Sequence, residues 1–294
     1  MKLIKKLSEE VKTEWRAFKA LAGWTFSYVY IKEWYILSLP FDILNMLFGL
    51  LTWYYYGLMF GKENIPILQA YGGSFISYLI IGVVVNSLLT HALWSFVSCI
   101  NAALTSTLYM GATRLTLPDY FRVAGIPFSR WMLAKIVLDY TGSFIRTSIY
   151  FVGGILIFGI DFPRNADVLG AFIALLLGLL ALTGISMIGA SLLLVVRRAY
   201  GKDPLTWLIS LLASIASGVY FPPEILPEFL RIVSLILPQT YTLRALRLCL
   251  LAGSPLLTNI SDLSALLISV ITLPLGILFL KLGLRIYEEK GLAF

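Results

Sequence analysis

Six long runs of apolar residues divide the chain, and each approaches or exceeds the length of a membrane span. They cover residues 34–60, 74–100, 133–160, 168–196, 205–221 and 263–284. A bilayer core of about 30 Å accommodates about 20 helical residues, and the first run is too long for the apolar core of a cleaved signal peptide. The pattern therefore predicts an all-α polytopic membrane protein with six transmembrane helices.

Lysine and arginine concentrate on alternate connections between these runs. They lie mainly before the first run, between the second and third, between the fourth and fifth, and after the sixth. Because short basic segments are retained in the cytoplasm, both termini of this multi-pass protein are predicted to lie on the cytoplasmic side of the cell membrane. The sequence shows no internal repeat and no linker, so residues 1–294 are interpreted as one transmembrane domain.

The segment between the fifth and sixth runs, residues 222–253, has a different pattern. Two apolar stretches, each too short to span a bilayer, are separated by Pro238. Pro222 and Pro223 are typical of a helix start and Gly253 of a helix end. A single fused span would bury charged residues at about 2.5–3.5 kcal/mol each. The pattern therefore predicts a re-entrant helical hairpin at the outer surface, just before the last span.

The first 30 residues predict an amphipathic helix at the membrane interface. Leu3, Leu7, Val11, Trp15 and Phe18 recur at three- and four-residue steps, and most of the basic residues fall elsewhere. Such a helix is suited to the cytoplasmic headgroup layer. Two roles remain open: anchoring the domain alone, or also holding a partner.

The composition agrees with a membrane protein and narrows the chemistry. The chain is 59% hydrophobic and 13% charged, which excludes an ordinary soluble domain. Its net charge of +7 is explained by basic segments facing anionic lipid, without a nucleic acid partner. One histidine, His91, and two distant cysteines, Cys99 and Cys249, offer neither a metal-ligand spacing nor a disulfide framework, so no metal site is predicted.

Motifs of catalysis are missing from the sequence, while a few ionisable residues lie inside the predicted spans. Neither the phosphate-binding G-x-x-x-x-G-K-[ST] nor the nucleophile motif G-x-S-x-G occurs, so the chain is not interpreted as an enzyme. Asp42 lies near the start of the first run, and Asp139 and Arg146 share one face of the third, with Lys135 four residues before Asp139. A proton or sodium relay would need carboxylates spread over several spans.

Aromatic and polar residues of the first two runs each have two interpretations. Trp53, Tyr54 and Tyr55 stand at the outer end of the first run, where an interfacial belt is the simpler explanation and a substrate path is the alternative. Asn86 belongs to a polar stripe on the second run, which suits helix contact or a path.

Two segments carry more specific patterns. Residues 114–130 read RLTLPDYFRVAGIPFSR, and residues 217–247 read SGVYFPPEILPEFLRIVSLILPQTYTLRALR. The first resembles the cytoplasmic coupling segment of ABC-2 type permeases, the membrane subunits of many ATP-binding cassette exporters, through Pro127, Ser129 and Arg130. The second is similar to the family's outer segment of Ser-Gly, Phe-Pro, further prolines and an arginine-bearing helix. Family members often carry several acidic residues ahead of the coupling helix, whereas here Asp119 is the acidic residue of the segment.

The resemblance implies a complex in which permease and ATPase are separate subunits. Two permease copies, or a permease and a paralogue, would form a dimer in the lipid bilayer and associate with separate ATPase subunits, which bind ATP and Mg²⁺. The ATPase would press on the coupling segment through Leu117, Asp119, Tyr120, Phe121, Arg122, Gly125, Ile126, Pro127, Ser129 and Arg130. An outer gate would be formed by Pro222, Pro223, Glu224, Pro227, Pro238, Tyr241 and Arg244.

The resemblance favours export of a hydrophobic or amphipathic molecule, drug-like or lipid-like, from the cytoplasm. The alternative within the family is a permease for a polysaccharide or a lipid-linked glycan. A second alternative from a different class is an ion-coupled secondary transporter, against which the missing carboxylate relay argues. A membrane-embedded transferase would require a cleft that brings Asp42, Asp139 or Asp262 within catalytic reach.

Overall fold

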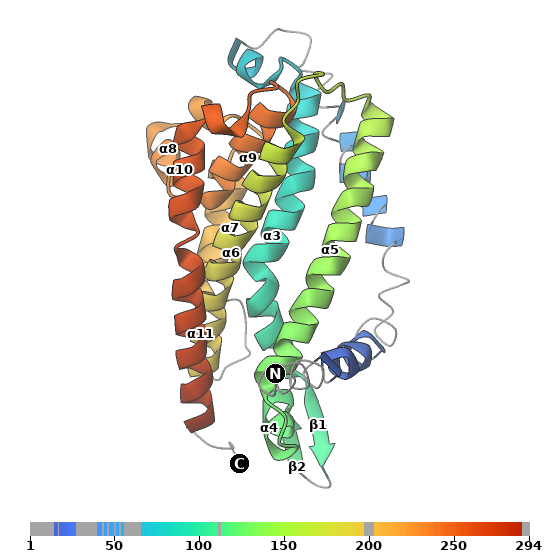
Figure 1. The fold of residues 1–294 in the computed structure, drawn as a ribbon, viewed down its shortest axis with the longest axis vertical. Helices are drawn as coiled ribbons and strands as arrows, with labels where there is room; N and C mark the ends of the chain where they lie inside the picture. The colour runs from blue at the N-terminus through green and yellow to red at the C-terminus, as the bar shows by residue number, and fades with distance from the viewer. Residues whose placement is uncertain are drawn as a thin grey trace, which may run out of the picture.

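Long helices packed side by side form the body of the molecule, as expected from the apolar runs (Figure 1). The computed structural model describes residues 15–16, 18–27, 40–42, 44–45, 47–49, 51–52, 54–55, 66–110, 113–196 and 203–289. Within these residues, four helical stretches are long and apolar enough to cross a membrane. They are α3 (Phe75–Thr105), α5 (Phe128–Phe158), α6 (Val168–Val196) and the consecutive helices α10 (Ile260–Ser269) and α11 (Thr272–Glu289).

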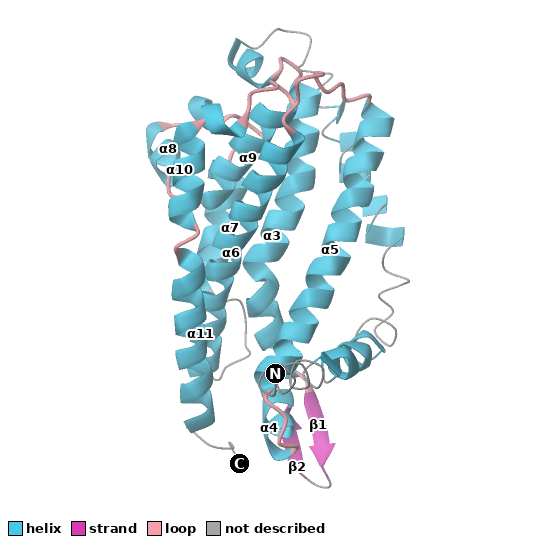
Figure 2. Cartoon of the chain, in the orientation of Figure 1, coloured by secondary structure: helices cyan, strands magenta, loops and turns pink. Residues whose placement is uncertain are grey.

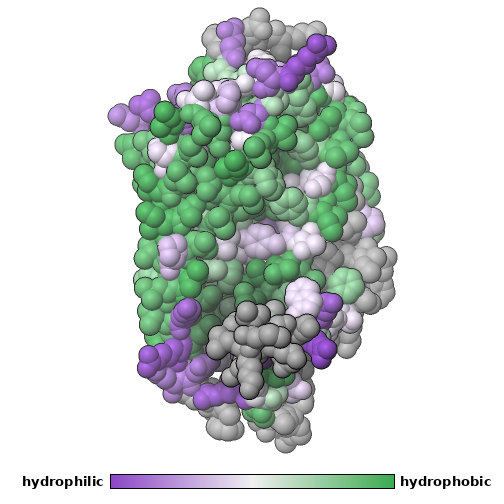
Figure 3. All heavy atoms as spheres, viewed as in Figure 1, coloured by the Kyte–Doolittle hydropathy of each residue, from purple (hydrophilic) through white to green (hydrophobic). Residues whose placement is uncertain are grey.

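Shorter elements cluster at the two ends of these helices (Figure 2). At one end lie the strands β1 (Thr107–Met110) and β2 (Thr113–Thr116) and the helix α4 (Leu117–Val123). At the opposite end lie η2 (Pro66–Tyr71), η3 (Pro223–Ile225), α8 (Glu228–Ser234), α9 (Pro238–Leu250) and η4 (Leu256–Thr258). We call these the α4 end and the hairpin end. Figure 3 shows a broad hydrophobic belt between hydrophilic side chains at both ends, as a bilayer requires.

Two predicted spans differ from the long helices. Most of the run at residues 34–60 lies outside the described residues, and those described between 40 and 55 are helical. The run at residues 205–221 forms α7 (Pro204–Ala216), which has 13 residues and thus a length of about 20 Å. Ser217 and Gly218, the latter with φ of +80°, turn the chain at its end. The count of six spans therefore remains a prediction.

The connection between α3 and α5 contains a β-hairpin that the sequence analysis did not predict. The strands β1 and β2 are antiparallel, with Thr107 opposite Thr116 and Met110 opposite Thr113. The second apolar run also continues as helix to Thr105, beyond the predicted end at residue 100. The segment predicted as an all-helical connection is thus a hairpin followed by the short helix α4.

Small residues allow α6 and α11 to approach closely. A Cβ atom at Gly276 would collide with the carbonyl oxygen of Gly184, and one at Gly283 would lie 3.0 Å from the Cβ of Ser191. The Thr272 hydroxyl donates to the Ala181 carbonyl at 2.7 Å, beside the break between α10 and α11. In hydrocarbon, association of this kind depends on backbone proximity and interhelical hydrogen bonds.

Gly276→Ala is expected to lower the free energy of unfolding by about 1–3 kcal/mol, because the added methyl group must push α11 away from the α6 backbone. Thermal unfolding of the purified protein measures the loss. Gly153→Ala on α5 is the matched control, because a Cβ there meets no atom within 4 Å, and equal melting temperatures for the two variants would contradict this account.

Candidate functional site

Helix α4 is a short helix held between two turns, and we call it the lever because the sequence analysis predicts that it transmits movement. Thr116 precedes it in extended conformation, Pro118 occupies its first turn, and Asp119 provides the acidic residue favoured there. At its end Gly125 adopts a φ of +68°, and the Ile126 amide donates back to the Phe121 carbonyl at 2.9 Å. Pro127 then begins α5 directly. Any displacement of α4 is therefore applied to the first turn of α5.

The two faces of α4 have different surroundings. Leu117 and Phe121 are 5% and 4% exposed and pack in a cluster with α3 and α5 side chains, including Ile100 and Trp131. Tyr120 and Val123 are 39% and 50% exposed on the other face. The prediction that Leu117 and Phe121 contact a partner is not supported by this geometry, because both fill the protein's own core. Val123 is an exposed apolar residue that the sequence analysis missed.

The end of α11 fastens α4 through a buried carboxylate. Asp119 is 7% exposed, and its Oδ2 accepts from the Thr116 hydroxyl at 2.5 Å. The Tyr287 hydroxyl donates to Asp119 Oδ1 at 3.4 Å and lies 3.2 Å from the Thr116 hydroxyl oxygen. Asp119 therefore holds the lever to α11, and little of its surface is available to a partner.

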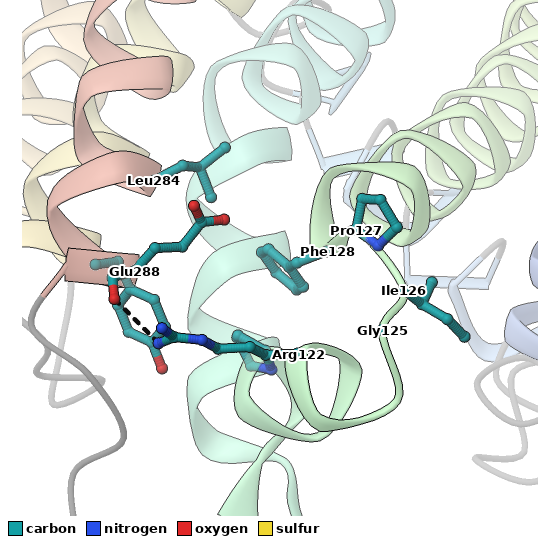
Figure 4. Close-up of a pocket in the computed structure, with 9 residues that line it drawn as sticks. Arg122, Gly125, Ile126, Pro127, Phe128, Leu284 and Glu288 are labelled. Atoms are coloured by element: carbon teal, nitrogen blue, oxygen red, sulfur yellow. Dashed lines mark hydrogen bonds between the residues drawn. The ribbon is translucent and has the colours of Figure 1, made fainter.

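A pocket of about 330 Å³ lies between the coupling segment and the end of α11 (Figure 4). Arg122 reaches across it and donates to the Glu288 carbonyl at 3.0 Å. Gly125, Ile126 and Pro127 form the opposite part of the wall. Ser129 is half-buried and Arg130 exposed in the first turn of α5. The predicted coupling residues thus lie together, although they divide into a buried and an exposed set.

The described part of the N-terminal helix also reaches α4. The Trp24 ring packs edge-on against the Phe121 ring with centroids 6.3 Å apart, and Leu21 packs against the same core cluster. Lys19 lies over the Trp15 ring, 5.4 Å from its centroid. The N-terminal helix therefore contacts the lever itself, and its predicted residues 1–14 lie outside the described residues.

At the hairpin end, α8 and α9 form two helices separated at Leu235–Leu237, close to the predicted division at Pro238. The Tyr241 hydroxyl donates to the Leu235 carbonyl at 2.8 Å, and Pro222, Pro223 and Pro238 are buried, whereas Glu224 and Pro227 are exposed. Arg244 forms an ion pair with Asp262 at 3.1 Å, which ties the hairpin to α10. Two short helices thus occupy this segment, and its re-entrant position in the membrane stays a prediction.

Arg247 fastens the hairpin to the rest of the molecule. Its side chain is 1% exposed, and it donates to the carbonyls of Tyr78, Gly218 and Val219 at 3.1, 2.7 and 2.8 Å. The Tyr78 ring lies 3.5 Å from the guanidinium carbon, and the absence of a side chain at Gly82 leaves room for the group. Burial lowers the pKa of Arg247 to about 10, so it is charged at pH 7. The sequence analysis assigned Arg247 no individual role.

A second polar contact at this end joins η2 to the hairpin segment. The Tyr71 hydroxyl donates to Glu224 Oε1 at 3.1 Å. Burial and the neighbouring Glu224 carboxylate raise the pKa of Tyr71 above its ordinary value, so the phenol stays protonated.

One known family matches the part of the chain that carries α4 and the hairpin segment. The family profile described as "ABC-2 family transporter protein" matches residues 119–280, more than half of the chain. The match begins within α4 and ends within α11, so it includes most of α4 and the whole hairpin segment. The chain belongs to the ABC-2 transporter family. A search of curated proteins finds no significant match to this permease.

The remaining predicted residues of the permease are scattered. Trp53 lies outside the described residues. Tyr54 packs against Phe158 at the end of α5, with ring centroids 5.0 Å apart, and Tyr55 is 62% exposed. Asn86 is half-buried on α3. The proposed path through these side chains therefore stays a prediction.

Four ionisable residues of the predicted spans form two ion pairs. Lys135 contacts Asp139 at 2.8 Å, as their spacing predicted, and Arg146 contacts Asp42 at 3.3 Å. This contact places the Asp42 carboxylate near the middle of α5. Within the described ranges, no group of three His, Cys, Asp or Glu side chains could hold a metal ion.

Replacing Arg247 by Met should lower the free energy of unfolding of the permease by about 3 kcal/mol or more, because three buried carbonyls lose charged donors. Arg247→Lys should retain only part of this stability, because a lysine ammonium group lacks the planar set of donors of a guanidinium. Thermal unfolding and proteolysis between residues 217 and 227 provide the readout. Arg231→Met, on the exposed face of α8, is the control, and similar losses in both variants would contradict the role of Arg247.

Proposed function

We propose that this chain is the permease subunit of an ATP-driven exporter that moves a hydrophobic or amphipathic molecule out of the cytoplasm. Its membership of the ABC-2 family supports a role as an ABC permease. The proposal that a separate ATPase drives this permease rests on the exposed face of α4. An apolar face with Tyr120 and Val123, flanked by Arg122, is suited to a groove on a separate ATPase subunit.

The lever's attachments support a mechanical role. Its buried face packs on α3 and α5, and its carboxylate binds Tyr287 of α11. Pressure from an ATPase on α4 would therefore reach three long helices at once. In the proposed complex, a second permease chain completes the path, and the hairpin controls its outer exit.

The end of the molecule that carries α4 is proposed to be cytoplasmic. The described N-terminal helix and the end of α11 both contact α4, so the two terminal regions lie on the same side. The hairpin lies at the opposite end, which agrees with an outer gate.

Tyr120→Asp combined with Val123→Asp should abolish co-purification with the ATPase subunit and reduce ATP-dependent transport at least 10-fold, because two charges replace the exposed apolar contacts. Leu257→Asp is the matched control, since Leu257 is 77% exposed at the hairpin end. Retained co-purification of the double variant would contradict the proposed docking face. Transport that persists without nucleotide and follows an ion gradient would instead favour secondary transport.

Tyr287→Phe should leave the ATPase subunit bound but reduce transport per ATP hydrolysed about 3- to 10-fold. The change removes the hydroxyl that links α11 to Asp119 and Thr116 and leaves the ring in place. Transport and ATPase rates measured in the same vesicles separate this from loss of docking. Unchanged transport per ATP would contradict a role of this contact in coupling ATP hydrolysis to transport.

A further inference from the structure

An apolar pocket lies between the hairpin and the break that separates α10 from α11. Its volume is about 620 Å³, which is within the range of ligand pockets. The wall is formed by the turn at residues 235–238, by Tyr241 of α9, by residues of α10 and α11, and by Ile185 of α6 and Ile209 of α7. The pocket thus joins the hairpin to three other helices.

The hydroxyl groups in this wall are already hydrogen-bonded within the protein. Those of Ser269, Thr272 and Tyr241 each donate to a backbone carbonyl, at 2.7, 2.7 and 2.8 Å. A polar ligand would therefore find no free donor on them, and its own desolvation would not be compensated. A hydrocarbon chain carries no such cost, so the pocket is suited to a hydrocarbon chain.

The turn that borders the pocket has the properties of a segment immersed in hydrocarbon. Leu235 and Ile236 are exposed, although turn residues are usually polar. The amides of Leu235, Ile236 and Leu237 all donate to carbonyls of α8, as a backbone within a membrane requires. On the α10 side of the wall, Ile268 is exposed as well. The pocket is therefore accessible from the hydrocarbon of the bilayer.

Helix α9 leads from the pocket to the hairpin end. The side chain of Thr242 packs on Gly178, about 15 Å along α6 from its first residue. The Cys249 carbonyl, two turns further along α9, accepts from the amide of Asp167, just before α6 begins. The pocket beside Tyr241 is therefore deeper than the end of α9, and a chain that enters from the hairpin end can extend toward the middle of the bilayer.

An exposed guanidinium stands at the outer rim of the pocket. Arg244 follows Tyr241 by three residues and Asp262 precedes Ala265 by three, so both lie about one turn nearer the hairpin end than these wall residues. Arg244 Nε donates to Asp262 Oδ2 at 3.1 Å, and the two side chains are 35% and 1% exposed.

The terminal N–H groups of this guanidinium are available to a ligand. Among the described residues, the contact with Asp262 is the one hydrogen-bonded ion pair that Arg244 forms, and it uses Nε alone. Because the carboxylate is covered, a ligand at the rim meets the guanidinium, which favours the oxygens of a phosphate group. Such a ligand leaves the ion pair intact. The site therefore combines an apolar chamber with a phosphate-binding rim.

We propose that this pocket holds an acyl chain of a phospholipid from the outer leaflet, whose phosphate binds the free N–H groups of Arg244. The leaflet follows from the proposed orientation, in which the hairpin end faces outward. The bound chain fills the space between the hairpin turn and the α10–α11 break. The inference goes beyond the transport role, because it concerns a lipid that stays with the permease.

Photolabelling of the assembled transporter in phosphatidylcholine vesicles tests the site. A trace of the lipid carries a photoactivatable diazirine at the end of one acyl chain. Without nucleotide, illumination should label the turn at residues 235–238 and the start of α11. Ala265→Phe places a ring in the pocket and should lower this labelling about 5-fold or more.

Ser264→Phe is the matched control for this variant. It adds the same ring at a neighbouring position that is exposed and lies outside the pocket wall, so the labelling should stay unchanged. An unlabelled turn in the wild type, or equal labelling of Ala265→Phe and Ser264→Phe, would overturn the proposal.

A conservative change tests the phosphate contact and remains decisive if Ala265→Phe fails to assemble. Arg244→Lys keeps a cation beside Asp262 but removes the planar set of donors, so labelling of the pocket by the phospholipid should fall about 3-fold. Arg231→Lys, on the exposed face of α8, should change nothing. Unchanged labelling in Arg244→Lys would contradict the phosphate contact.

A long-chain alkane with the same diazirine separates the two parts of the site. It has no phosphate, so it should label the pocket equally in the wild type and in Arg244→Lys. If Arg244→Lys lowers the labelling by both probes, the variant has changed the chamber itself, and the phosphate contact is contradicted.

The timing of labelling distinguishes a resident lipid from an exported molecule. A resident lipid should be labelled to the same extent before and during ATP hydrolysis. Labelling that occurs only during hydrolysis would show that the pocket takes a molecule in transit, and the assignment to a resident lipid would be wrong. Because the first experiment needs neither nucleotide nor transport, a failure of the proposed ATP-driven export does not affect its result.

Discussion

A buried hydrogen-bonding group is costly unless it is paired, and this constraint decides how both ends of the molecule are fastened. At the hairpin end, Arg247 is buried without a carboxylate and is satisfied by three carbonyl oxygens. At the α4 end, Asp119 is buried and receives hydroxyl groups from Thr116 and Tyr287. Each of these groups joins segments that are far apart in the sequence. A movement at either end must therefore break these hydrogen bonds or move the bonded segments together.

Two long elements connect the hydrogen-bonded groups of Arg247 and Asp119 at the two ends. Helix α3 accepts from Arg247 at Tyr78, near its start, and packs against α4 near its other end. The α10–α11 pair holds Arg244 through Asp262 and holds Asp119 through Tyr287. Because α6 lies against α11 without intervening side chains at Gly184 and Gly276, these two helices are closely packed. The hairpin and the lever are thus attached at opposite ends of the same helices.

Much of this frame was predictable because its signals are long or chemically specific. Runs of apolar residues predicted α3, α5, α6 and the last span to within a few residues, and the prolines around residues 222–238 predicted the two hairpin helices. The strands β1 and β2 were missed, although Gly111 and Ala112 separate two four-residue segments that contain threonine, leucine and tyrosine. The prediction failed because four-residue strands next to a strong helix carry little periodic signal.

The site was harder to predict, since its residues have roles that depend on partners distant in the sequence. No local pattern distinguishes Leu117 and Phe121, which are buried, from Tyr120 and Val123, which are exposed, on a helix of only seven residues. Arg247 resembles any basic residue of an outer loop until Gly82, Tyr78 and Gly218 are brought around it. Such assignments require the fold, because the groups that satisfy each side chain are unknown before it forms.

The position of α5 connects the lever to the ion pair between Arg146 and Asp42. Helix α5 begins at Phe128, directly after Pro127, and is joined to α6 by the Tyr140 and Thr183 hydroxyls, whose oxygens are 2.5 Å apart. Its Arg146 lies about one and a half turns beyond that contact and pairs with Asp42 at 3.3 Å. A tilt of α5 about the Tyr140 contact, driven by α4, would therefore change the position of Arg146 relative to Asp42.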